Sequence, residues 1–177
     1  MRALICYESM YGNTRHVAEA IGDGLRPTMA VSVVPVGTVA NEDLEGFDLL
    51  VVGAPTHAHG LPRTSSRKEA AARASAPDDP RSIEPGADAP GVREWLDGLA
   101  TLEMAVATFD TRVDMSPILT GRASKGIAKR MRHLGAVEAS PPESFLVLKD
   151  DTLKPGEVDR ARAWGAQLAQ RVSATAT

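Results

Sequence analysis

Aromatic residues are scarce in this sequence, in which Phe, Trp and Tyr make up 4% of 177 residues. Cysteine is scarcer still, because Cys6 stands alone and no internal disulfide can form. Its place in an apolar run favours a small core residue over a redox thiol. No apolar stretch approaches the roughly 18–20 residues that span a bilayer, so we expect no membrane partner.

An excess of positive charge is also missing. The chain has 20 Lys and Arg residues against 23 Asp and Glu residues, which gives a formal charge of −3. With no basic excess and none of the common recognition motifs, we expect no nucleic-acid partner. The N-terminus lacks the apolar core and small-residue cleavage site of a signal peptide, which predicts a cytoplasmic protein.

Apolar segments alternate with amphipathic ones along the chain. Predicted strands cover residues 2–7, 30–34, 48–53 and 104–109, and Pro141-Pro142 splits a fifth into 137–140 and 144–148. Predicted helices cover residues 14–25, 63–75, 91–100, 122–134 and 157–172. Continuous apolar runs are typical of strands buried on both faces. The order predicts an α/β fold, with a doubly wound five-stranded parallel sheet between helices.

The length fits one domain, with an insertion at about residues 63–90. The insertion starts with a basic helix that holds Arg63, Arg67, Lys68 and Arg73, and continues as a Pro-rich acidic loop. Solvated helix faces explain most such charge runs. The alternative is a docking surface for a redox partner or for the phosphates of NADPH.

Three polar loops follow strands and should meet at the carboxyl edge of the sheet: residues 9–14, 54–62 and 110–119. The first offers hydroxyls and an amide around Gly12, just before a helix. It has no lysine and is not a P-loop. Such a loop suits a phosphomonoester that is held but not transferred. The alternative is an ordinary capped helix start, with Asn13 or Thr14 as the cap.

The first loop, Ser9-Met10-Tyr11-Gly12-Asn13-Thr14, resembles the flavodoxin phosphate-binding signature, Ser/Thr-x-Thr-Gly-Asn-Thr, with Tyr11 in place of a threonine. Val51–Thr56 resembles the strand and start of the second flavin loop, and Phe109–Arg112 stands where the third would be. The resemblance implies a flavodoxin-like three-layer fold that binds FMN. The implied binding residues are Ser9, Met10, Tyr11, Gly12, Asn13, Thr14, Pro55, Thr56, His57, Ala58, His59, Gly60, Asp110, Thr111 and Arg112.

Two departures from the flavodoxin pattern concern the flavin ring. The second loop often carries a tryptophan, but reads Thr56-His57-Ala58-His59-Gly60 here, and no tyrosine follows the fourth strand. The resemblance therefore implies weaker FMN binding and a less extreme reduction potential. His57 or His59 could donate a proton to a flavin or quinone. A His-x-His metal pair lacks further ligands, and a Ser9-His57-Asp110 triad lacks its nucleophile elbow, so we expect neither.

The favoured function is electron transfer through FMN, with a redox partner protein or an NAD(P)H-linked reductase. One alternative is an NAD(P)H-dependent FMN or quinone oxidoreductase, and another is a flavin-free binding or regulatory module. We assign no binding role to Glu8, because a carboxylate beside the first loop would repel phosphate unless it points away.

Overall fold

The computed structural model describes residues 1–57, 59–74, 81–87 and 89–175. The strands are β1 (Arg2–Tyr7), β2 (Ala30–Pro35), β3 (Leu49–Pro55), β4 (Ala105–Val113), β5 (Val137–Glu138) and β6 (Glu143–Val147). The helices are α1 (Asn13–Leu25), α2 (Thr64–Ala74), α3 (Val92–Asp97), α4 (Pro117–Thr120), α5 (Ala123–His133) and α6 (Glu157–Thr175). No helix in these ranges is long and apolar enough to cross a membrane.

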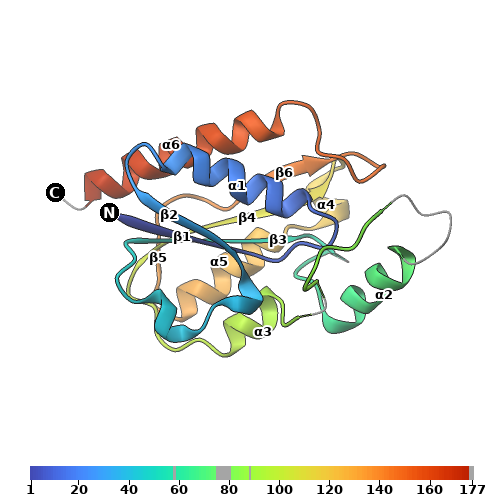
Figure 1. The fold of residues 1–177 in the computed structure, drawn as a ribbon, viewed down its shortest axis with the longest axis horizontal. Coiled ribbons are helices and arrows are strands. Elements are labelled where there is room, and N and C mark those ends of the chain that lie inside the picture. The colour runs from blue at the N-terminus through green and yellow to red at the C-terminus, as the bar shows by residue number, and fades with distance from the viewer. Residues whose placement is uncertain (58, 75–80, 88, 176–177) are drawn as a thin grey trace.

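The strands form one parallel sheet in the order β2-β1-β3-β4-β5, and β6 also pairs with β4 (Figure 1). The two short strands β5 and β6 share one position, because Pro141 and Pro142 interrupt the ladder between them. The predicted five-position parallel sheet with its split last strand is therefore confirmed. Helix α4 was not predicted, since its residues were assigned to a polar loop.

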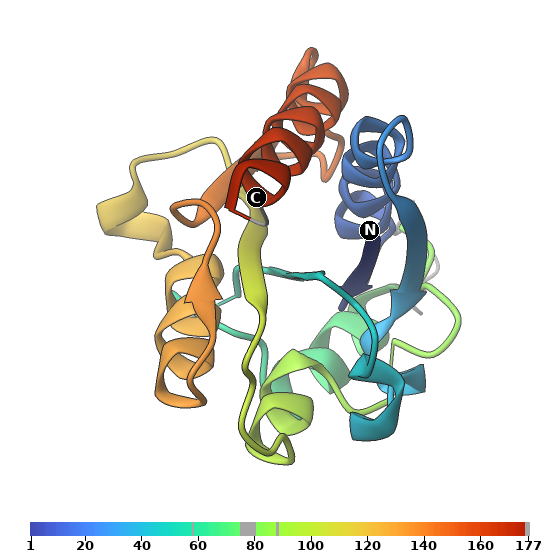
Figure 2. The ribbon, with the colours of Figure 1, turned by 90° about the vertical axis from the view of Figure 1, so that its left-hand side faces the viewer.

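Helices cover both faces of the sheet in three layers (Figures 1 and 2). Helices α1 and α6 pack on one face, where Ile5 and Val51 are fully buried. Helices α3 and α5 lie on the other face, against Leu50 and Val52. Strands β1 and β3 are thus buried on both sides, as their apolar runs predict. Strand β2 is only half-buried, because it forms the edge of the sheet.

Three of the few aromatic rings form a cluster in the core. Phe109, Phe145 and Trp164 meet edge to face, with ring centroids 6.1–6.5 Å apart. Gly53 leaves the space for this cluster, because a Cβ at that position would collide with the Phe109 ring. Phe109 therefore lies in the strand, as predicted, and its ring serves the core rather than a ligand.

Helices α1 and α6 approach closely through two glycines. A Cβ on Gly24 would collide with the backbone carbonyl of Arg162, and a Cβ on Gly165 would collide with that of Ile21. Backbone atoms cannot move aside as a side chain can, so these positions require glycine. The contact fixes α1, whose first residues form part of the site described below.

We predict that Gly24→Ala destabilises the protein by about 3 kcal/mol, because the added methyl forces the two helices apart. Gly126→Ala is the matched control in α5, where a Cβ meets nothing within 4 Å. It should stabilise the protein by up to about 1 kcal/mol through helix propensity. Urea unfolding measures the stability of both variants. If Gly24→Ala were as stable as the wild type, the close packing of α1 against α6 would be contradicted.

Candidate functional site

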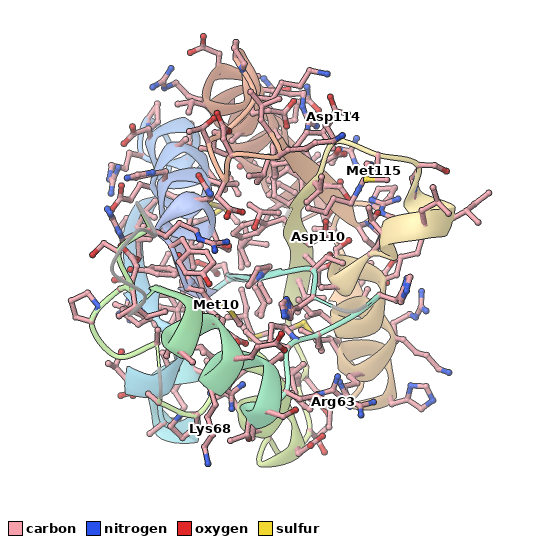
Figure 3. The ribbon with its side chains drawn as sticks, turned by 90° about the vertical axis from the view of Figure 1, so that its right-hand side faces the viewer. Met10, Arg63, Lys68, Asp110, Asp114 and Met115 are labelled. Carbon is pink, nitrogen blue, oxygen red and sulfur yellow. The ribbon has the colours of Figure 1, made fainter. Side chains whose placement is uncertain are left out.

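A pocket of about 270 Å³ lies at the carboxyl edge of the sheet, where β1, β3 and β4 end (Figure 3). Ten of the residues singled out from the sequence line it: Ser9, Met10, Tyr11, Asn13, Thr14, Pro55, Thr56, His57, Thr111 and Arg112. The fold thus brings together parts of all three predicted loops. Gly12, His59, Gly60 and Asp110 do not line the pocket, and Ala58 lies outside the described residues.

The first loop turns at Gly12, whose φ of 93° lies in the left-handed region that glycine adopts at little cost. Gly12 is the N-cap of α1, and no side chain in the described part of the chain caps this helix. The alternative in which Asn13 or Thr14 caps the helix is therefore wrong. Ser9 Oγ instead accepts the Gly12 N–H at 3.1 Å, and Asn13 Nδ2 donates to the Asp151 carbonyl at 2.6 Å.

The uncapped start of α1 leaves hydrogen-bond donors at the pocket. Within the described ranges, the backbone N–H groups of Met10, Asn13 and Thr14 have no acceptor. The Thr14 hydroxyl is buried and lies 2.8 Å from the Thr111 hydroxyl. Free N–H groups at a helix start carry partial positive charge and bind anions.

The second loop contributes fewer groups than predicted. Thr56 Oγ1 accepts the Ala123 N–H at 2.9 Å, so this hydroxyl serves the start of α5. His57 and Gly60 close a tight turn through two backbone hydrogen bonds of 2.9 and 3.1 Å. His59 is exposed, with a left-handed φ of 70°, and faces a neighbouring cleft instead of the pocket. Only His57 of the two histidines therefore reaches the pocket.

The first four residues of the predicted third loop, 110–113, belong to a strand. Asp110, Thr111 and Arg112 belong to β4, which extends to Val113. Asp110 is fully buried, and its Oδ2 accepts both the Ser124 N–H at 2.8 Å and the Ser124 hydroxyl at 2.6 Å. Burial raises the pKa of the Asp110 carboxyl, although both Ser124 hydrogen bonds oppose this. The Asp110 side chain therefore contacts Ser124 and does not line the pocket.

Arg112 brings a positive charge to the pocket wall. Its Nη1 donates to the carbonyls of Val113 and Met115 at 3.3 and 2.7 Å, and its Nε is buried with no partner among the described residues. Within that part of the chain, no carboxylate lies within 4 Å of this guanidinium. Carbonyl contacts orient the group without cancelling its charge.

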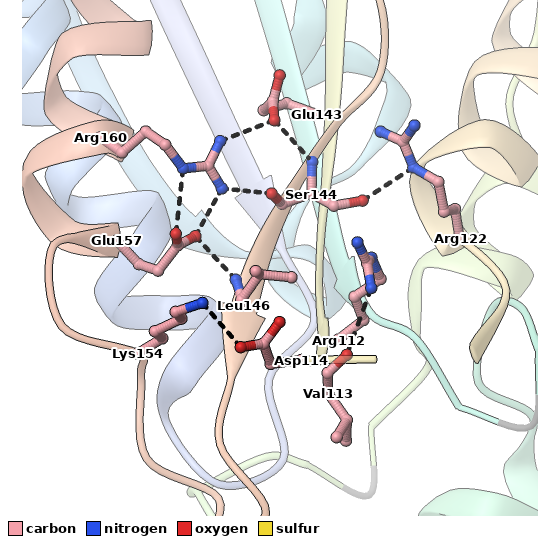
Figure 4. Close-up of polar contacts among 10 residues, drawn as sticks. All are labelled: Arg112, Val113, Asp114, Arg122, Glu143, Ser144, Leu146, Lys154, Glu157 and Arg160. Carbon is pink, nitrogen blue, oxygen red and sulfur yellow. Dashed lines mark hydrogen bonds and ion pairs between the residues drawn. The ribbon is translucent and has the colours of Figure 1, made fainter. Parts of the chain in front are cut away.

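A polar network on β6 and α6 supports the opposite wall (Figure 4). Arg160 pairs with Glu143 at 2.7 Å and with Glu157 at 2.5 Å, which joins the strand to the helix. The chain between them supplies Val147 and Asp151 to the pocket. Sequence reasoning missed both residues, because nothing in the sequence indicates how the 148–156 turn folds back.

Helix α2 and the described chain after it, within the predicted insertion, form a further wall that the sequence did not predict. Glu69 and Ala70 of α2 line the pocket, as does Arg81 after it. The Tyr11 hydroxyl donates to the Ala70 carbonyl at 3.0 Å, and the Arg81 guanidinium lies 5.2 Å from the Tyr11 ring centroid. Tyr11, the only Phe, Tyr or Trp among the described residues of the lining, therefore holds α2 and Arg81 against the pocket.

A buried ion pair anchors α2 behind the first loop. Arg67 and Glu8 are each 5% exposed, with Nη1 and Oε1 3.5 Å apart, and Arg67 also pairs with Glu94 at 3.0 Å. Glu8 Oε2 accepts the Val92 N–H at 2.9 Å. Burial raises the pKa of Glu8, against the Val92 hydrogen bond and the Arg67 charge. Glu8 therefore has a structural partner, and Arg67 is not part of an exposed docking surface.

Metal binding has no support from the arrangement of ligands. Among the described residues, no group of three or more His, Cys, Asp and Glu side chains could hold a metal ion. His57 lines both the pocket and the neighbouring cleft, and His59 lines the cleft without reaching the pocket. Cys6 is fully buried, and burial raises the pKa of its thiol to about 12.

Comparison with solved structures identifies the fold. A flavodoxin from the domain Archaea is 19% identical over 98% of this chain and 99% of its own, with a TM-score of 0.64. Flavodoxin 2 from Bacillus cereus is 17% identical over 97% and 99%, with a TM-score of 0.68. A flavodoxin from Streptococcus pneumonia TIGR4 is 18% identical over 99% of both chains, with a TM-score of 0.66.

A sequence comparison adds to the structural one. Residues 4–67, which include the first two loops, match a family model described as a flavodoxin domain. No curated protein matches the chain. The α/β fold with its parallel sheet is therefore flavodoxin-like, as the resemblance in the first loop implied.

We predict that Arg67→Met destabilises the protein by about 3 kcal/mol at pH 7, because it leaves the Glu8 carboxylate buried without its cation. The folded-state pKa of Glu8, already raised, would rise further. The loss should therefore shrink below about pH 4, where the unfolded chain also binds the proton.

Two further variants test this explanation by urea unfolding. Lys68→Met removes an exposed charge from the same helix and should change stability by less than about 0.5 kcal/mol. Glu8→Gln in the Arg67→Met background should recover part of the loss. A pH-independent loss that Glu8→Gln does not reduce would mean that Arg67 acts by packing alone.

Proposed function

We propose that this flavodoxin-like domain binds FMN in the pocket and transfers electrons through it. The observation that carries the proposal is the set of backbone donors at Met10, Asn13 and Thr14, which have no acceptor among the described residues. A loop of N–H groups and hydroxyls without lysine holds a phosphate but does not favour its transfer. FMN combines such a phosphomonoester with one- and two-electron redox chemistry.

The remaining walls fit the other parts of FMN. The hydroxyl of Thr111 and the polar atoms of Thr56 and Asn13 suit a ribityl chain, and Pro55, His57 and Val113 offer surfaces for the ring. At about 270 Å³ the pocket is smaller than most ligand sites, which occupy about 300–1,000 Å³. Part of the ring would therefore remain exposed, which permits electron transfer by contact with a partner.

The ring would lie beside charge rather than beside stacked aromatics. The Tyr11 side chain contacts Ala70 and Arg81, so among the described residues no Phe, Tyr or Trp of the lining is free to stack on a ring. Arg112 would place a positive charge near the ring, and a nearby positive charge favours the uptake of electrons. We infer weaker binding and a higher reduction potential than a stacked, acidic site would give.

The electrons would come from a redox partner protein or an NAD(P)H-linked reductase in the cytoplasm. The functional role of this chain's residues would be to hold the phosphate, orient the ring and limit water access from the α2 side. None of them is required as a covalent or acid–base catalyst for electron transfer.

We predict that the purified protein quenches the fluorescence of added FMN and that Gly12→Asp weakens the affinity about 100-fold, or ~2.7 kcal/mol. The aspartate would add negative charge to the turn that carries the free N–H groups, and its positive φ strains the backbone at this position. Gly156→Asp is the matched control, with φ of 88° and nothing within 4 Å of an added Cβ.

The control variant should bind FMN as the wild type does. Absence of quenching by the wild-type protein in excess FMN would refute the proposed function. Equal binding by wild type and Gly12→Asp would place the phosphate elsewhere.

A further inference from the structure

A second hollow of about 510 Å³ adjoins the pocket on the side of α2 and α3. Its wall includes His57, His59, Arg63, Ser66, Glu69 and Arg93. His57 and Glu69 also line the pocket, so the two hollows share a wall. We call this second hollow the arginine cleft, after Arg63 and Arg93.

Arg93 is held in place by neutral groups. Its Nε donates to the Pro62 carbonyl at 3.1 Å, and its Nη2 donates to the Leu61 carbonyl at 2.8 Å. In the described part of the chain, no carboxylate lies within 4 Å of it. The guanidinium is therefore fixed at the cleft while its positive charge stays unneutralised.

Other cations crowd the same region. Burial lowers the pKa of Arg93, and the positive charges of Arg130 and Arg63 lower it further, against Glu94 and Asp97. Arg63 is exposed, and its side chain forms no ion pair with a described residue. A bound anion would relieve this repulsion.

Two acids near the cleft, Glu94 and Asp97, form ion pairs with arginines other than Arg63 and Arg93. Glu94 already pairs with Arg67 at 3.0 Å and accepts the Gly91 N–H at 3.0 Å. Asp97 lies 3.8 Å from Arg130, and 64% of its side chain is exposed. Glu69 lines both hollows, so one carboxylate lies on the cleft wall beside the two arginines.

We propose that the arginine cleft binds the diphosphate group of a nucleoside diphosphate. Two guanidinium groups can each hold one phosphate in a forked, charge-assisted contact, and the Ser66 hydroxyl adds a further polar group. The volume falls in the range of small-ligand sites, which favours a nucleotide over a protein surface. Such a ligand would lie beside the pocket, across His57.

The test is isothermal titration of the full chain with ADP and AMP at low salt. ADP should bind about tenfold more tightly than AMP, because the second phosphate engages the second arginine. Arg63→Gln should weaken ADP binding about tenfold. The matched control Lys68→Gln removes the same charge from another side of α2 and should change the affinity less than about twofold (Figure 3).

Two ligands and two variants separate this proposal from the proposed function. Arg63→Gln should leave FMN binding unchanged, and Gly12→Asp should leave ADP binding unchanged. Three results would overturn the proposal that the arginine cleft binds a diphosphate. These are equal ADP affinity in wild type and Arg63→Gln, equal affinities for ADP and AMP, and loss of ADP binding in Gly12→Asp. Failure of FMN to bind would overturn the proposed function. The ADP titration would then still test diphosphate binding in the arginine cleft by itself.

Discussion

Parallel pairing of β1, β3 and β4 is the constraint on which the site depends. Their register aligns Tyr7 with Gly53 and Gly53 with Phe109, so all three strands reach the same edge of the sheet. Burial on both faces by helices stabilises this pairing, since each central strand hides apolar side chains in both directions. Residues far apart in the sequence thereby become walls of one pocket.

Attachment of the insertion is the second constraint. Arg67 compensates the buried Glu8 charge, the Tyr11 hydroxyl holds the Ala70 carbonyl, and both contacts join α2 to the end of β1. A backbone hydrogen bond from Glu84 to Met10 adds a third link at 2.8 Å. These contacts place a charged helix beside the pocket, which gives the site a wall that a simple doubly wound sheet would lack.

Features that depend on a local sequence pattern were predicted correctly. Apolar runs located the strands, the prolines at 141 and 142 located the break in the last one, and the first loop indicated the fold. The sequence placed the end of the strand before Asp110, because a charged residue normally ends a buried strand. No local pattern indicates that Ser124 of α5 donates two hydrogen bonds to this carboxylate. Arg67 was misplaced for the same reason, since its partner Glu8 is distant in sequence. Glu8 stands directly after a buried strand, and this position was the one sign in the sequence that a cation would be buried beside it.

The distribution of charge explains why the net charge of −3 says little about ligands here. Most described acids near the site already have partners: Glu8 with Arg67, Glu84 with Arg15 and Asp151 with Arg81. Arg112 and Arg93 instead contact carbonyl oxygens, which orient a guanidinium but leave its charge in place. The unneutralised positive charge therefore gathers in the two adjoining hollows, and a hollow of that kind attracts anions whatever the sign of the whole chain. In the proposed function, Arg112 and Arg93 would present positive charge to a partner, which an acidic electron carrier would not do.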